Sequence, residues 1–147
     1  MSMFCFQCQE TAGGKGCTVR GVCGKTEETA KLMDLLIYTL KGISNIVVKE
    51  RLDAAKLDSL NGEMFTSLFM TITNANFDSN ALERQIGKML VLRDGLKKEG
   101  ASYHDAAVFS VNNRTDMLAK ASPVGVLATR SEDVRSLREL TVYGLKG

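Results

Sequence analysis

The sequence predicts an all-α protein, built as an antiparallel three-helix bundle that follows a loop rich in glycine and cysteine. Three observations favour this class. The chain has 147 residues with one proline and no tryptophan. Apolar residues recur at helical spacing in three consecutive segments. All four cysteines lie at or before position 23, where glycine is also frequent.

Composition places the chain among ordinary globular domains. Hydrophobic residues make up 44% and charged residues 24% of the chain, which excludes a disordered tail or a fibrous repeat. The net charge of +2 argues against nucleic acid or a membrane as the partner. No apolar run reaches the roughly 18 residues of a membrane span, and residues 1–8 lack the features of a secretory signal. We therefore expect a cytoplasmic protein with reduced thiols.

The first element, residues 1–25, is expected to be a loop, because glycine interrupts any helical or strand pattern there. Its cysteines follow the spacing C-x2-C-x8-C-x5-C. They are Cys5, Cys8, Cys17 and Cys23. Four thiolates on one glycine-rich loop can surround one metal centre, so all four are candidate ligands.

Three kinds of site compete for this pattern. A disulfide framework is disfavoured in a reducing compartment. A structural zinc site is usually built from two closely spaced cysteine pairs, whereas five residues separate Cys17 from Cys23. An iron–sulfur cluster accepts closely spaced cysteines together with a more distant one, and the spacing favours it. Lys15, Arg20 and Lys25 in the same loop would stabilise an anionic cluster, or they are simply solvated.

The three-helix bundle is expected over residues 26–100. Thr26 is a suitable N-cap, and Glu27 and Glu28 complement the helix dipole in the first turn. Short connections between three amphipathic segments favour an antiparallel arrangement. Thr73–Asp78 breaks the second segment, and Gly100 can stop the third. The apolar positions are, in chain order, Leu32, Leu36, Leu40, Ile43 and Val47; Leu57, Leu60, Met64, Leu68 and Ile72, with Phe65 and Phe69 widening the stripe; and Leu82, Ile86, Met89, Leu90 and Leu96.

Residues 101–130 carry a weaker pattern and are expected to form a linker. Within it, Asn113–Ala121 predicts a short helix. Ser122 and Pro123 should end that helix, because the residue before a proline is biased away from helical backbone.

The last segment, residues 131–147, repeats residues 26–42 at an offset of 105. The identical pairs are Glu27/Glu132, Leu32/Leu137, Leu35/Leu140, Tyr38/Tyr143, Leu40/Leu145, Lys41/Lys146 and Gly42/Gly147. We interpret the match as a duplication, with chance similarity between two amphipathic helices as the alternative. Residues 131–147 are therefore expected to be the first helix of a second, truncated bundle.

A lone amphipathic helix is marginal in water, so its apolar face needs a partner. That face holds Val134, Leu137, Leu140 and Leu145. It could pack on the first bundle, pair with a second copy in a homodimer, or fray.

The cysteine loop and several helical segments resemble the hybrid-cluster proteins, also called prismane proteins or hydroxylamine reductases. The segments that carry the resemblance are Met3–Thr11, Gly16–Thr18, Gly21–Lys25, Glu27–Ala30, Leu35–Tyr38, Thr71–Phe77, Val126–Thr129 and Leu137–Leu140. The compact cysteine spacing is similar to the branch of the family with a [4Fe-4S] cluster. The resemblance implies that Cys5, Cys8, Cys17 and Cys23 bind this cluster, in a helical domain made of two three-helix bundles.

The resemblance also implies an oxidoreductase that reduces hydroxylamine to ammonia or nitric oxide to nitrous oxide. Its catalytic hybrid cluster is held by residues beyond the helical domain, so no catalytic residue is assigned here. His104, the sole histidine, is expected at the surface. This chain would then relay electrons, be inactive alone, and need an electron-donor protein and C-terminal domains as partners. The alternative function is a structural helical module with a four-cysteine zinc site.

Overall fold

The computed structural model describes residues 3–8, 10–73 and 77–147, and in this part of the chain the regular secondary structure is helical, without a strand. The predicted all-α class is confirmed. The α-helices are α1 (Glu27–Glu50), α2 (Ala54–Ile72), α3 (Ser79–Gly95), α4 (Asp105–Val108), α5 (Arg114–Val124) and α6 (Glu132–Leu145), and the 3-10 turns are η1 (Ala12–Gly14) and η2 (Val126–Ala128). In the predicted break at Thr73–Asp78, positions 74–76 lie outside the described residues, as do positions 1, 2 and 9 of the cysteine loop.

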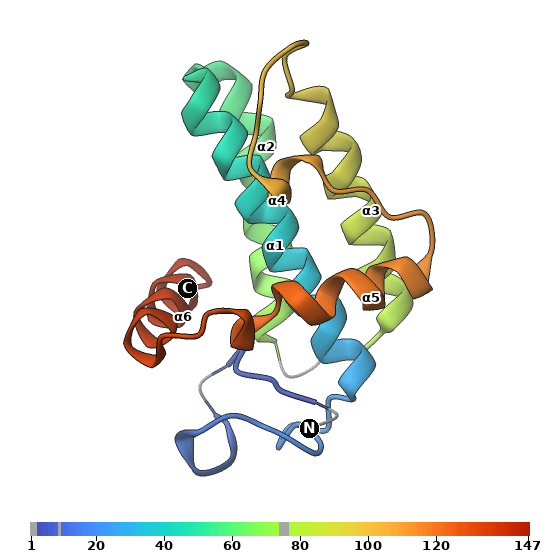
Figure 1. Ribbon diagram of the computed structural model, residues 1–147, viewed down its shortest axis with the longest axis vertical. Coiled ribbons are helices and arrows are strands. Elements are labelled where there is room, and N and C mark those ends of the chain that lie inside the picture. Colours follow the sequence, from blue (N-terminus) through green and yellow to red (C-terminus); the bar gives the residue numbers. More distant parts are fainter. Residues whose placement is uncertain (1–2, 9, 74–76) are drawn as a thin grey trace.

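Helix α1 forms the centre of the molecule, and α2, α3, α4 and α5 all pack against it (Figure 1). Thr26 is its N-cap, as predicted, and the Thr26 hydroxyl accepts a hydrogen bond from the Thr29 N–H at 3.2 Å. The helix ends at Arg51, whose φ of 50° is left-handed. Because α1 has neighbours on several sides, half of its positions are buried, including residues outside the predicted stripe such as Leu35 and Ile46.

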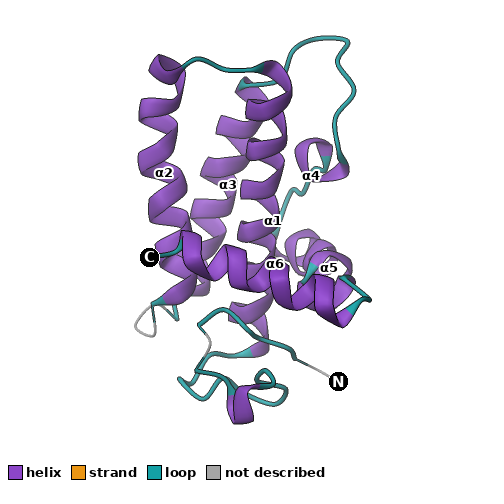
Figure 2. Ribbon diagram, turned by 90° about the vertical axis from the view of Figure 1, so that its left-hand side faces the viewer, coloured by secondary structure: helices purple, strands orange, loops and turns teal. Residues whose placement is uncertain are grey.

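Helices α1, α2 and α3 run antiparallel and form the predicted bundle (Figure 2). Helix α3 buries Leu82, Ile86 and Met89 against α1. Helix α2 lies at the edge of the bundle and meets its neighbours along a narrow seam, so Leu60 is its only fully buried large apolar residue. The expectation that Phe65 and Phe69 widen the buried stripe is wrong. Both are more than half exposed, and their rings stack on each other with centroids 6.2 Å apart.

Two helices, α4 and α5, lie between residues 101 and 130 and contribute to the main core through Phe109, Met117 and Ala121. The predicted stop at Ser122 and Pro123 is wrong, because α5 continues to Val124. Proline lacks an N–H but tolerates helical φ, and the turn is closed by the Gly125 N–H, which donates to the Ala121 carbonyl at 3.0 Å.

The close approach of α4 to α1 depends on Gly42. A Cβ atom at this position would lie 2.0 Å from the carbonyl oxygen of Ala106, so only glycine fits. The buried guanidinium of Arg93 on α3 fixes the same segment by donating to the carbonyls of Ala106 at 3.2 Å and Phe109 at 2.7 Å. A sequence segment with little periodicity is therefore held in place by specific polar contacts.

Helix α6 crosses the molecule beside the cysteine loop (Figure 2). Ser131 caps it by accepting from the Val134 N–H at 3.5 Å, at the repeat position of Thr26. The helix forms, but its predicted apolar face remains exposed and does not pack on the first bundle. The described part of the chain has no helix with the length and apolar character needed to cross a membrane.

Candidate iron–sulfur site and its surroundings

The cysteine loop is organised around a pairing of Cys5 with Cys17. Each backbone N–H donates to the other residue's carbonyl, at 3.0 and 2.9 Å, in an isolated antiparallel bridge. Both side chains are buried in a small apolar cluster with Met3 and with Ala30 of α1. This cluster attaches the loop to the end of the bundle.

The other two cysteines, Cys8 and Cys23, are partly exposed, and all four are free thiols. Among the described residues, no three His, Cys, Asp or Glu side chains are grouped closely enough to hold a metal ion. The structure thus brings Cys5 beside Cys17 without gathering the four sulfurs into one centre. Their assignment as ligands stays a prediction.

The donor set nevertheless fits an iron–sulfur cluster chemically. Four thiols are available on one loop, and the Val22 N–H donates to the Cys17 sulfur at 3.4 Å, a contact of the kind that tunes cluster ligands. A Cβ on Gly21 would lie 3.2 Å from the Cys23 sulfur, so glycine leaves space beside that thiol.

Burial controls the protonation of Cys5. It raises the pKa of this thiol to about 11, and a hydrogen bond from the Gln7 backbone N–H lowers it in part. Without a metal the thiol is therefore protonated at neutral pH, and ligation would release its proton.

Of the three cationic residues noted in the loop, only Lys25 is buried, with 1% of its surface exposed. Its ammonium donates to the Thr71 carbonyl of α2 at 3.5 Å and lies close enough to Cys5 to interact with it electrostatically. Lys15 and Arg20 are exposed. Lys15 and Arg20 are therefore solvated, and a role for Lys25 in stabilising a cluster stays a prediction.

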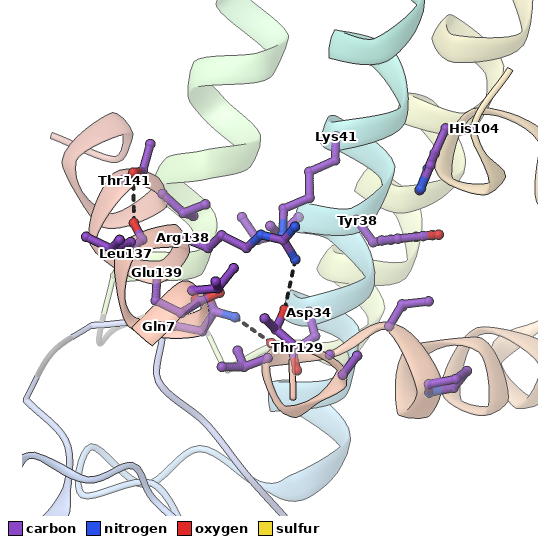
Figure 3. A pocket seen from close by; sticks show the side chains of 18 residues that line it. Gln7, Asp34, Tyr38, Lys41, His104, Thr129, Leu137, Arg138, Glu139 and Thr141 are labelled. Carbon is purple, nitrogen blue, oxygen red and sulfur yellow. Dashed lines mark hydrogen bonds between the residues drawn. The ribbon is translucent and has the colours of Figure 1, made fainter. Parts of the chain in front are cut away.

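A polar network missed by the sequence reasoning joins the loop to α1 and α6. Gln7, between Cys5 and Cys8, donates from Nε2 to the Asp34 carboxylate at 2.6 Å (Figure 3). The Lys146 ammonium, which follows α6, donates to the Gln7 carbonyl at 3.0 Å and to its Oε1 at 2.5 Å. The sequence paired Lys146 with Lys41 but contained no signal for its burial.

The Asp34 carboxyl faces a pocket of about 680 Å³ between α1, η2 and α6, which Glu139 and Arg138 also line (Figure 3). Burial, together with the nearby Glu139, raises the pKa of Asp34 to about 7 despite the hydrogen bond from Gln7. Burial likewise raises the pKa of Glu139. The two acids occupy equivalent repeat positions, so the duplicated pattern places like charges in one pocket.

His104 is exposed, as the sequence predicted. Its Nδ1 accepts from the Ala106 N–H at 3.1 Å and so caps α4. Within the described residues it belongs to no metal-binding group. Its role in this structure is to begin a helix.

A helical bundle with a four-cysteine loop at one end defines the class of this protein as a helical domain with a candidate metal-binding loop. The model of the Prismane/CO dehydrogenase family matches residues 3–147, and the chain belongs to this family. It is 66% identical to a hydroxylamine reductase of Acetivibrio thermocellus, 50% to one of Clostridium perfringens and 47% to one of Clostridium botulinum. Each match covers the whole chain, which spans 28% to 31% of the length of these relatives.

Proposed function

We propose that this chain is the electron-transfer part of a hydroxylamine reductase-like protein and relays electrons through a [4Fe-4S] cluster. The observation that carries the proposal is the set of four free thiols on one loop at the end of the bundle. Proteins of this family are iron–sulfur proteins, and the relatives are named as hydroxylamine reductases.

In this proposal Cys5, Cys8, Cys17 and Cys23 hold the iron as thiolates. The cluster supplies one-electron redox chemistry when it is bound. The chain's contribution is to fix the loop and its charges. The Cys5–Cys17 bridge and the apolar contacts of Met3 hold one side of the loop, and Cys8 and Cys23 remain accessible.

The reductase activity belongs, in this proposal, to the whole protein. Electrons would come from a donor protein in the cytoplasm and pass to a catalytic cluster held by C-terminal domains. The four cysteines are the only ones in the chain and His104 the only histidine, so no second set of soft ligands is available. We expect the purified chain to reduce no hydroxylamine above the background of free iron.

The test is anaerobic reconstitution of the chain with iron and sulfide. We expect a brown protein with about four iron and four sulfide per chain. A colourless chain that retains zinc through the same treatment would overturn the proposal in favour of a structural zinc site.

Single variants Cys5→Ser and Cys17→Ser test the ligands. Each is expected to lose or degrade the cluster, because a serine hydroxyl is a poor replacement for a thiolate. Thr18→Ala, an exposed neighbour of Cys17, is the matched control and should keep its iron. Wild-type iron and sulfide content in both serine variants would show that the four-cysteine site is wrong.

A further inference from the structure

Lys146 is buried, and among the described residues no carboxylate lies within ion-pair distance of its ammonium. Only 3% of its surface is exposed, and both hydrogen-bond acceptors of its ammonium are neutral oxygens of Gln7. Asp34 and Glu139 are near enough to interact with it electrostatically. Yet Lys146 is absent from the ion pairs found among the described residues, which join charged atoms within 4.0 Å. Burying an unpaired charge is unfavourable, so this position needs an explanation.

The repeat provides an internal comparison. Lys41 occupies the position equivalent to Lys146, and it is exposed to solvent. The Tyr-x-Leu-Lys-Gly pattern by itself therefore does not bury its lysine. Lys146 is buried because the end of α6 lies against the cysteine loop.

Lys146 lies near one of the candidate ligands, Cys5. Gln7 accepts both hydrogen bonds from Lys146, and the backbone N–H of the same Gln7 donates to the Cys5 sulfur. Lys146 also interacts electrostatically with Cys5 directly. Lys25, the second buried ammonium, likewise has a neutral carbonyl as its partner and is near enough to Cys5 to interact with it electrostatically. Two buried cations thus interact electrostatically with Cys5.

We propose that Lys146 is a positioning residue of the cysteine loop, holding Gln7 beside Cys5 and supplying a positive charge that raises the reduction potential of the cluster. The potential part of this inference rests on the proposed function. Burial lowers the pKa of Lys146 to about 8, which leaves the ammonium mostly protonated at pH 7.

The direction of the effect follows from charge. Uptake of one electron from a reductant adds one negative charge to a site ligated by thiolates. A buried cation nearby stabilises that reduced form more than the oxidised form, because a low dielectric strengthens the interaction. Removing the cation should therefore make reduction harder.

The experiment compares K146M with K41M in reconstituted chain at pH 7, by anaerobic redox titration with dithionite as the reductant. We expect K146M to lower the equilibrium constant for reduction at least tenfold, which is about 59 mV for one electron. K41M removes an exposed lysine at the same repeat position and should change the constant less than twofold. An unchanged potential in K146M overturns the charge role.

A second variant keeps the test decisive if K146M fails to bind a cluster. If K146M binds no iron, K146R restores the positive charge at the same place. Recovery of iron with a potential near that of wild type supports the proposal. Loss of iron in both variants contradicts it, because charge would then not be what the site requires.

A second measurement needs no cluster. In the cluster-free chain, K146M should accelerate amide hydrogen exchange over residues 3–8 at least tenfold, while K41M should not. Unchanged exchange overturns the positioning role. If the wild-type chain takes up no iron at all, the proposed function fails, and this exchange result still decides whether Lys146 holds the loop.

Discussion

The first and last helices carry the same pattern and have opposite surroundings. Leu35 of α1 is 0% exposed, whereas its repeat partner Leu140 of α6 is 62% exposed. The leucine pairs at positions 32/137 and 40/145 differ in the same way. The lysines reverse the order, since Lys41 is exposed and Lys146 is buried.

This contrast shows that an amphipathic pattern specifies a helix and its apolar face, but not which element, if any, packs against that face. Both helices form, and each begins after an N-cap residue with a hydroxyl group. In both cases the hydroxyl accepts a hydrogen bond from the backbone N–H three residues later. Helix α1 is surrounded by four helices, while α6 touches the rest of the chain mainly through η2, Val142 and Lys146. The surroundings therefore decide which leucines contribute to stability.

The largest expected effect separates the matched leucines. Leu35→Ala leaves a cavity in the core and should cost roughly 2–5 kcal/mol of unfolding free energy. Leu140→Ala removes an exposed side chain and should cost less than about 0.5 kcal/mol. Denaturant unfolding of both variants measures the difference. Equal losses of unfolding free energy in the two variants would mean that Leu35 and Leu140 are buried alike, which would contradict the contrast between α1 and α6.

A smaller effect is expected at the contact between α1 and α4. Gly42→Ala forces a Cβ against the Ala106 carbonyl, so α4 must move, and we expect a loss of about 1–3 kcal/mol. Gly144→Ala in α6 meets no atom within 4 Å and should gain up to about 1 kcal/mol through helix propensity. Thermal unfolding of the two variants shows whether each substitution lowers or raises stability. A stabilising Gly42→Ala would place α4 farther from α1.

The third effect depends on pH and concerns the paired acids of the repeat, Asp34 and Glu139. The pKa of Asp34 is about 7 in the folded chain, above its ordinary value of 3.8. Between about pH 4 and pH 7 the folded state therefore binds a proton that the unfolded state has released, so Asp34 lowers stability as the pH rises.

Asp34→Asn should flatten the decline of stability over this range. Asp58→Asn, on the exposed side of α2, is the control and should leave the decline unchanged. Unfolding curves at several pH values test the pair. A decline that persists undiminished in Asp34→Asn would show that this carboxyl titrates normally in the folded chain.

The sequence by itself determined the helical class, the N-cap at Thr26 and the repeat, because these depend on local spacing and capping chemistry. It also determined the candidate ligands, since four cysteines in one loop restrict the chemistry before any fold is known. Spacing could not predict how much of α2 is buried, because that depends on how many helices surround it. The exposed rings of Phe65 and Phe69 are the consequence.

The tertiary structure alone decided the environment of the loop. Gln7, Asp34 and Lys146 are separated by up to 139 positions in the chain, and no local pattern connects them. The persistence of α5 through Pro123 is another such outcome, because packing of Met117 and Ala121 on α1 outweighs a local stop signal. Burial and charge pairing depend on all the residues that surround a side chain, and residues distant in the sequence become neighbours only when the chain folds.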